Sequence, residues 1–254
     1  IASQWSSFKL SSTGETVGEI TFDYSRGIKG TIGAKPVMVP VTAVIENIDT
    51  AAKEEYSFNV VHDKRWTPFM VTIALYFAIG ESTIIGSDIT AWVESVVKAK
   101  GIEPILSRDF FTSSGNPGFS AAVPIWDKIG FLMDNEIQSL SITGVNLSLK
   151  VKSGRQVRYV ERFIPDKTKV KPGDSIELIL FVREREKPVV KERMTVKIPE
   201  DIPEGNIRLS IYNGLLTARR NLERAPGLRR TDSIQKFTKL LTDEYDAYTM
   251  ITEF

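Results

Sequence analysis

His62 is the only histidine in the chain, and it stands next to Asp63. A serine nucleophile activated by a histidine would have to use His62, with a serine and a carboxylate brought to it in space. Ser113, Ser114 and Ser120 lie in or near a glycine-containing loop, but none has the Gly-x-Ser-x-Gly pattern that exposes a nucleophile on a sharp turn. We therefore interpret His62 and Asp63 as polar residues at the end of a strand, before a helix.

Neighbouring carboxylates occur in three polar segments of the chain. General acid–base catalysis needs a carboxyl group whose pKa is raised by an apolar pocket, so these segments are more typical of a solvated surface. The last of them could hold a divalent cation weakly, although it lacks the spacing and the turn glycine of a calcium loop. The three groups are Glu54 with Glu55, Glu200 with Asp201, and Asp243 and Glu244 with Asp246.

Gly27, Gly30 and Gly33 are spaced by three residues. A phosphate-binding loop needs its glycines between a strand and the start of a helix, whereas strands are expected on both sides of these three. We interpret them as tight turns or bulges.

The chain has one basic cluster. Nucleic-acid binding favours basic side chains interleaved with aromatic ones, and residues 218–232 contain no aromatic residue and two acidic ones. We expect no nucleic-acid partner. The cluster either meets an acidic surface, of a protein partner or of this chain itself, or is a solvated face. Its members are Arg219, Arg220, Arg224, Arg229 and Arg230.

Composition narrows the remaining chemistry. The chain has 254 residues, no cysteine and a net charge of +1. The lack of cysteine excludes disulfides, thiolate metal sites and cysteine nucleophiles, and a single histidine excludes multi-histidine metal sites. We expect no cofactor and no bound metal. The balanced charge gives no global argument for nucleic acid or an acidic substrate.

The elements that would position any site fall into two expected domains. Residues 1–138 are predicted to form a mixed β domain with two helices. The first runs over 67–79, is capped by Thr67 and is buried; the second runs over 120–133 with Pro124 in its first turn. The apolar stretch 69–79 is shorter than the roughly 20 residues of a membrane span, so no transmembrane segment is expected.

Residues 87–101 leave two alternatives open, because their apolar residues have helical spacing but are largely β-branched. Residues 139–254 have the pattern of short strands separated by turns, which predicts a small immunoglobulin-like β-sandwich. It is followed by a short C-terminal helix over 233–241 and an edge strand within 248–254. The expected fold class is therefore mainly β with a few helices (α+β).

Short sequence blocks run through most of the chain in a fixed order. They cover residues 7–10, 16–20, 27–33, 36–41, 58–61, 63, 67–68, 135, 142–145, 170–174, 198–205 and 213–214. Their order and spacing resemble the SpoIVB-like serine peptidase family, most closely its larger bacterial members with extra C-terminal regions. That family is similar to chymotrypsin-like peptidases, with a catalytic serine in a Gly-Ser-Pro context and a histidine after a glycine.

This chain has neither motif, and the resemblance places both before Ile1, so it assigns no catalytic residue here. It implies the last strands of a partial chymotrypsin-like barrel and an appended sandwich, in an exported or cell-envelope protein. Over 87–101 it implies a strand hairpin turning at Gly101, and we adopt that expectation. The chain opens with Ile1 rather than Met, so we expect a processed or partial polypeptide.

The expected function is that of a non-catalytic C-terminal region. It would support an upstream peptidase-like domain and bind protein partners. The upstream region of the same polypeptide, or a second copy of the chain, would cover the open sheet edges expected in residues 1–65. Two alternatives stay open: a stand-alone structural or protein-binding module without a peptidase, and a serine hydrolase that uses His62.

Overall fold

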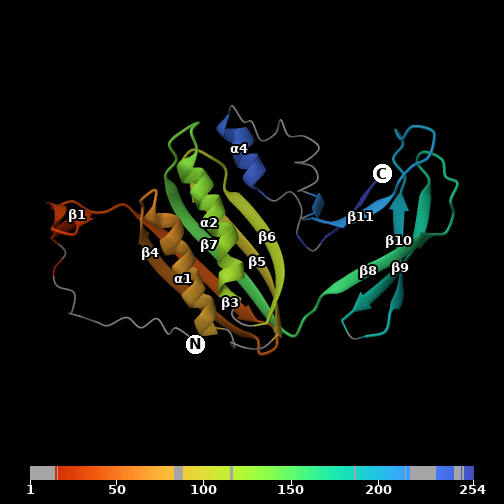
Figure 1. The fold of residues 1–254 in the computed structure, drawn as a ribbon, viewed down its shortest axis with the longest axis horizontal. Helices are drawn as coiled ribbons and strands as arrows, with labels where there is room; N and C mark the ends of the chain where they lie inside the picture. Colours follow the sequence, from red (N-terminus) through yellow and green to blue (C-terminus); the bar gives the residue numbers. More distant parts are fainter. Residues whose placement is uncertain are drawn as a thin grey trace. The chain divides into compact units, whose positions relative to one another are not determined.

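The computed structural model describes residues 15, 17–82, 88–114, 117–185, 187–214, 216–217, 233–242, 247 and 249–254. Within these residues the chain is mainly β, with three helices and four sheets, none of which closes into a barrel (Figure 1). This confirms the expected α+β class. The chain divides into two compact units, Ile1–Met38 and Val39–Phe254.

The first unit contains one antiparallel hairpin, β1 (Gly18–Tyr24) and β2 (Gly27–Ile32). Its two-residue turn is closed by Gly27, whose φ of +154° favours glycine. A bulge between Ile20 and Phe22 shifts the register by one residue.

The second unit is built around a five-stranded sheet with the order β4-β3-β7-β5-β6. β3 is parallel to β7, whereas β5 is antiparallel to β6 and β7. Two helices, α1 and α2, lie side by side over one face of this sheet (Figure 1). The bounds are β3 Met38–Asn47, β4 Ala52–Val61, α1 Trp66–Ser82, β5 Asp88–Ala99, β6 Ile105–Ser114, α2 Gly118–Asp134 and β7 Ile142–Ser153.

The main core lies between the sheet and these two helices. Alternate residues of β3 and β7 point into it, among them Val41, Ala43, Val145 and Leu149, all fully buried. Such alternation is typical of a sheet with one covered face, and burial of these side chains is the main stabilising contribution of the layer.

The start of α1 corrects one sequence prediction. The helix is capped by Asp63 and not by Thr67, because Oδ1 of Asp63 accepts hydrogen bonds from the amides of Arg65 and Trp66 at 2.9 and 3.0 Å. Thr67 is the second helical residue, and its hydroxyl donates to the carbonyl of Val61 at 2.8 Å. A carboxylate at this position also interacts favourably with the helix dipole.

The expectation that α1 is buried all round is also wrong. Val71, Leu75 and Ile79 on one side are fully buried, but the opposite side carries exposed apolar residues. In α2 the helix begins at Gly118, which places Pro124 inside it and not in the first turn.

The ambiguous segment forms strands, since β5 and β6 are paired along their length and turn near Gly101, whose φ is +84°. The expected domain boundary after residue 138 is wrong. β7 lies between β3 and β5 in the five-stranded sheet and does not belong to a separate sandwich. β7 is paired on both sides and is therefore a central strand of the sheet. Nearly every second side chain along it is buried.

The remaining strands form a second core. β8, β9 and β10 form a sheet of order β10-β9-β8, and β11 pairs with β12. Leu178 and Leu180 of β9 are buried, as the alternation predicts, and Ser233 caps α4 through its side chain. The bounds are β8 Arg158–Pro165, β9 Ser175–Glu184, β10 Val190–Lys197, β11 Ser210–Asn213, α4 Ile234–Leu241 and β12 Met250–Glu253. Among the described residues, none of the helices is long and apolar enough to cross a membrane.

Candidate functional site

The hairpin β1–β2 is the most exposed apolar structure in the described chain. Ile28, Gly30 and Ile32 alternate along β2 and share a face, and Ile20 pairs with Gly30 on that face. The exposed fractions are 66% for Ile20, 67% for Ile28 and 89% for Ile32. An aliphatic strand face that is left in water gains none of the burial energy that normally stabilises a sheet.

The other face of the hairpin is aromatic. The bulge places Phe22 opposite Lys29, away from the isoleucines, and Phe22 stacks on Tyr24 with ring centroids 5.6 Å apart. The ammonium of Lys29 lies 5.9 Å from the Phe22 ring, within the range of a cation–π contact. Both aromatic residues are about half exposed. The hairpin therefore has apolar surface on both faces.

Glycine is required at two positions of the hairpin. A Cβ atom on Gly30 would lie 2.5 Å from the carbonyl oxygen of Glu19, and one on Gly18 would lie 2.3 Å from that of Thr31. Gly33 has a φ of +79° and donates its amide to the carbonyl of Val17. Gly33 lies in a turn, as the sequence predicts, whereas Gly18 and Gly30 allow close strand pairing, which the sequence did not predict. The hairpin is followed by β3 and not by a helix, so it does not form a phosphate-binding loop.

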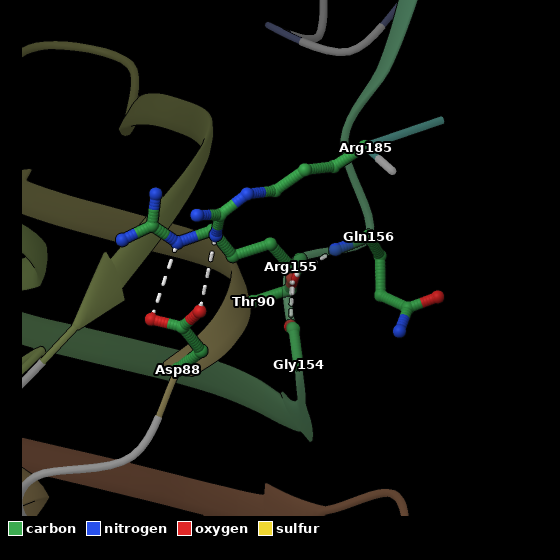
Figure 2. Close-up of polar contacts among 6 residues, drawn as sticks. All are labelled: Asp88, Thr90, Gly154, Arg155, Gln156 and Arg185. Carbon is green, nitrogen blue, oxygen red and sulfur yellow. Dashed lines mark hydrogen bonds and ion pairs between the residues drawn. The ribbon is translucent and has the colours of Figure 1, made fainter. Parts of the chain in front are cut away.

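A polar joint connects the five-stranded sheet to the strands that follow it. Figure 2 shows the carboxylate of Asp88, at the start of β5, facing two guanidinium groups. Its Oδ1 lies 3.2 Å from Nε of Arg155, and its Oδ2 lies 3.3 Å from Nη1 of Arg185. Each carboxylate oxygen thus meets one cation, and the groups are about 35–50% exposed.

The backbone beside this joint is held by Thr90. Its hydroxyl donates to the carbonyl of Gly154 at 2.7 Å and accepts from the amide of Gln156 at 2.8 Å (Figure 2). Gly154 also donates its amide to the carbonyl of Asp88, with a φ of +81° that favours glycine. Thr90 and Arg155 hold the end of β7 next to the start of β5, and Arg185 holds the end of β9 to Asp88. This arrangement is typical of a structural joint.

Sequence reasoning missed this joint because its members are far apart along the chain. Asp88 and Arg185 are separated by 97 positions, so no local spacing connects them. The only local signal is Gly154, which marks a turn directly before Arg155.

His62 makes a structural contact. Its Nε2 accepts a hydrogen bond from the amide of Ile142 at 3.1 Å and lies 3.4 Å from Oγ of Ser141. The lone pair that a general base would use is therefore occupied by a backbone donor. Asp63, the carboxylate next to His62 in the sequence, is engaged in capping α1.

The serines considered with His62 lie elsewhere. Ser113 pairs with Ile89 near the start of β5, whereas Ile142, the partner of His62, pairs with Ala99 at its end. The strand between Ile89 and Ala99 spans roughly 33 Å. Ser114 adjoins Ser113, and Ser120 lies in the first turn of α2. The described geometry does not bring Ser113 or Ser114 to the histidine.

The carboxylates also take structural positions. Glu54 accepts hydrogen bonds from the hydroxyls of Ser82 and Tyr56, each at 2.6 Å, and these bonds hold the pKa of Glu54 below its ordinary value. The same carboxylate raises the pKa of Tyr56. A carboxyl group with a lowered pKa is a weak base. The hydrogen bonds among Glu54, Tyr56 and Ser82 instead fasten the end of α1 to β4. Glu200 forms an exposed ion pair with Lys197.

Several candidate residues lie outside the described residues. These are Arg219, Arg220, Arg224, Arg229 and Arg230 of the basic cluster, and the acidic residues Asp243, Glu244 and Asp246. The described part of the chain contains no group of three or more side chains that could hold a metal ion. No protein-family model, curated protein or solved structure matches this chain.

Proposed function

We propose that this chain is the non-catalytic C-terminal region of a SpoIVB-like, chymotrypsin-related protein, where it supports an upstream peptidase-like domain and binds protein partners. The observation that carries the proposal is the hairpin β1–β2, with apolar side chains on both faces. A two-stranded hairpin is at best marginally stable in water, so it needs further strands or a covering layer.

In this proposal the hairpin supplies the last strands of a chymotrypsin-like barrel. The other strands belong to the upstream region of the same polypeptide and pair with the hairpin's outer edges. Gly30 supports this role, since it allows the close strand approach on the aliphatic face. The isoleucines Ile20, Ile28 and Ile32 then point into the barrel, where their burial stabilises the complete domain.

The strands after β7 supply the partner-binding part. Ile211 of β11 and Phe254, directly after β12, pack on the core formed by β9 and β10. Two sheets that share a core in this way support an immunoglobulin-like sandwich. β8 and β10 are the edges of the three-stranded sheet, and either edge can accept a strand from a protein partner. The arginine cluster stays a candidate surface for an acidic partner.

Catalysis in this proposal belongs to the upstream region. The chain has no Gly-Ser-Pro serine and no Gly-His histidine, and His62 is bound to the amide of Ile142. An extracytoplasmic or cell-envelope location follows from the resemblance alone. The alternative is a stand-alone structural or protein-binding module whose hairpin is covered by an unrelated protein.

Sequencing upstream of Ile1 tests the assignment first. An open reading frame that encodes a Gly-Ser-Pro serine and a Gly-His histidine supports the peptidase-related assignment. A frame that lacks both motifs overturns it and leaves the stand-alone module.

A second test addresses the hairpin in the parent protein. Ile32→Lys places a charge on the aliphatic face, and Thr31→Lys places the same charge on the opposite face of the same strand. We expect Ile32→Lys to lower the parent's thermal stability and its peptidase activity, and Thr31→Lys to leave both nearly unchanged. Equal effects of the two variants, or no effect of Ile32→Lys, would contradict the proposed barrel.

A further inference from the structure

The outer side of the helix layer is apolar where a two-layer fold should be polar. α1 has no charged residue from Thr67 to Gly80, although one of its sides faces away from the sheet. Helices that cover one face of a sheet normally carry polar residues on the outside. We call this surface the aromatic face; its members, which are 38–64% exposed, are Trp66, Phe69, Met70 and Phe77 of α1 and Phe119 and Trp126 of α2.

The aromatic face is continuous across the two helices. Trp66 and Phe69 meet edge to face with centroids 6.1 Å apart, and Phe69 meets Trp126 in the same way at 5.9 Å. Met70 and Phe77 follow on the same side of α1 at helical spacing, and Phe119 precedes Trp126 by two turns of α2. The ring contact between Phe69 of α1 and Trp126 of α2 joins the exposed apolar residues of the two helices into one continuous surface.

We propose that the aromatic face binds a second copy of this chain, with α1 packed antiparallel on α1 of that copy around a two-fold axis near Ile73. Ile73 is the midpoint between Trp66 and Gly80, so an axis there sets the large Trp66 side chain opposite Gly80 of the second copy. The same axis sets Phe69 opposite Phe77. This inference does not depend on the proposed function, which rests on the hairpin.

The area of the face fits a dimer. With about 200 Å² for a side chain of this size, the exposed fractions amount to roughly 550 Å² on one copy. Two copies would bury roughly 1,100 Å², which exceeds the threshold of about 1,000 Å² for specific interfaces. A patch of this size is also at the upper end of what monomers leave exposed.

The charges at the two ends of α1 favour the antiparallel arrangement. Lys64 and Arg65 stand directly before the helix, and Glu81 lies in its last turn; all three are exposed. Lys64 forms an ion pair with Asp134 of α2. A two-fold axis at Ile73 sets Arg65 of one copy opposite Glu81 of the other, twice per dimer. Antiparallel helices also align their dipoles favourably.

The surrounding charges favour a protein copy over a lipid surface. Asp127 and Asp134 lie on the exposed side of α2, and Glu81 lies at the end of α1. These carboxylates would face the negative charge of an anionic membrane. Binding to anionic vesicles is therefore an outcome that would overturn the proposal if it occurs in place of self-association.

Sedimentation velocity of this chain over a dilution series tests the proposal. We expect a reversible monomer–dimer equilibrium, and Phe77→Glu should raise the dimer dissociation constant at least about thirtyfold. The matched control is Phe131→Glu, which adds the same charge at an exposed phenylalanine of α2. Phe131 lies five residues beyond Trp126, about 140° around the helix and off the aromatic face.

Circular dichroism confirms that both variants keep the fold. A chain that stays monomeric at every concentration overturns the proposal, and so does a Phe131→Glu effect as large as that of Phe77→Glu. Either result assigns the aromatic face to another occupant, such as the upstream polypeptide.

Cross-linking tests the position of the axis. The chain has no cysteine, so Ile73→Cys introduces a single thiol at a half-buried position near the proposed axis. A short bismaleimide should link two copies through Ile73→Cys but not through Ser148→Cys, which is exposed on the other face of the sheet. Equal cross-linking of the two variants contradicts the axis.

Charge exchange tests the antiparallel order. Arg65→Glu and Glu81→Lys should each weaken the dimer, and the double variant should restore it. Weakening that adds up in the double variant contradicts the proposed order of the helices.

Discussion

The hairpin β1–β2 and the strand pair β3–β7 have similar residues and opposite surroundings. Ile32 of the hairpin is 89% exposed, whereas Leu149 of β7 is fully buried. Both residues belong to paired strands: Ile32 pairs with Gly18, and Leu149 pairs with Ile45 and Val93. The difference is that α1 and α2 cover β7, whereas the described residues of the hairpin's own unit supply no covering layer. A strand pattern thus indicates which face needs cover, but not whether the same chain provides it.

The largest effect should come from truncation under the helices. Leu149→Ala should lower the free energy of unfolding by about 2–5 kcal/mol, because it leaves a cavity in the main core. Ile32→Ala should change it by less than about 0.5 kcal/mol, since its side chain is already in water. Urea denaturation followed by tryptophan fluorescence measures both. Similar losses for the two variants would show that the hairpin is covered within this chain.

A Cβ atom at Gly30 should break the hairpin alone. Gly30→Val forces a branched side chain against the carbonyl oxygen of Glu19, 2.5 Å from the new Cβ. Amides of β1 and β2 should exchange hydrogen at least about tenfold faster, which corresponds to about 1.4 kcal/mol of lost pairing. Those of β7 should be unchanged.

Gly130→Ala is the control for this glycine substitution. Apart from the backbone of its own helix and its chain neighbours, no atom lies within 4 Å of a Cβ at Gly130, which is inside α2. We expect a gain of roughly 0.5–1 kcal/mol in stability, because alanine favours the helix. Exchange in β7 that speeds up in Gly30→Val as much as in the hairpin would contradict the separation of the two ladders.

The joint at Asp88 should contribute less. Asp88→Asn removes the charge that meets Arg155 and Arg185, and because all three groups are partly exposed the loss should be about 0.2–1 kcal/mol. The loss should shrink as salt is added. Glu200→Gln removes the ion pair between Glu200 and Lys197, which is more exposed than the joint at Asp88, and should have a smaller effect. A salt-independent loss would show that the joint acts through packing.

The smallest effect is a pH dependence at the fastening between α1 and β4. The folded state lowers the pKa of Glu54 below its ordinary value of 4.5, so its stabilising contribution is present above pH 4.5 and is lost as the pH falls through the folded value. Glu54→Gln should therefore be less stable than the parent near neutral pH, and the difference should vanish in acid. Paired urea titrations at several pH values measure this, and a difference that grows in acid would contradict it.

Local sequence patterns predicted most of the helices and strands, but not which other elements pack against them. The alternation of Ile176, Leu178 and Leu180 correctly predicted β9, and Ser233 correctly predicted the start of α4. The boundary after residue 138 failed because β7 has the pattern of any half-buried strand, and its neighbours β3 and β5 are distant in sequence. Thr67 failed as a cap because the helix begins before it: Asp63 accepts from the amides of Arg65 and Trp66, and the Thr67 hydroxyl donates to the carbonyl of Val61.

The parallel pairing of β3 with β7 also determines when the centre of the five-stranded sheet can form during synthesis. Val41 pairs with Val145, so the centre of the five-stranded sheet forms only after both helices have left the ribosome. Contacts of such long separation slow folding, whereas β1 and β2 meet locally and early. A nascent chain that ends before Ile142 would contain β3 and β4 but not β7, so the edge of β3 that pairs with β7 would be unpaired. Synthesis of this protein thus includes an interval in which chaperone protection would matter most.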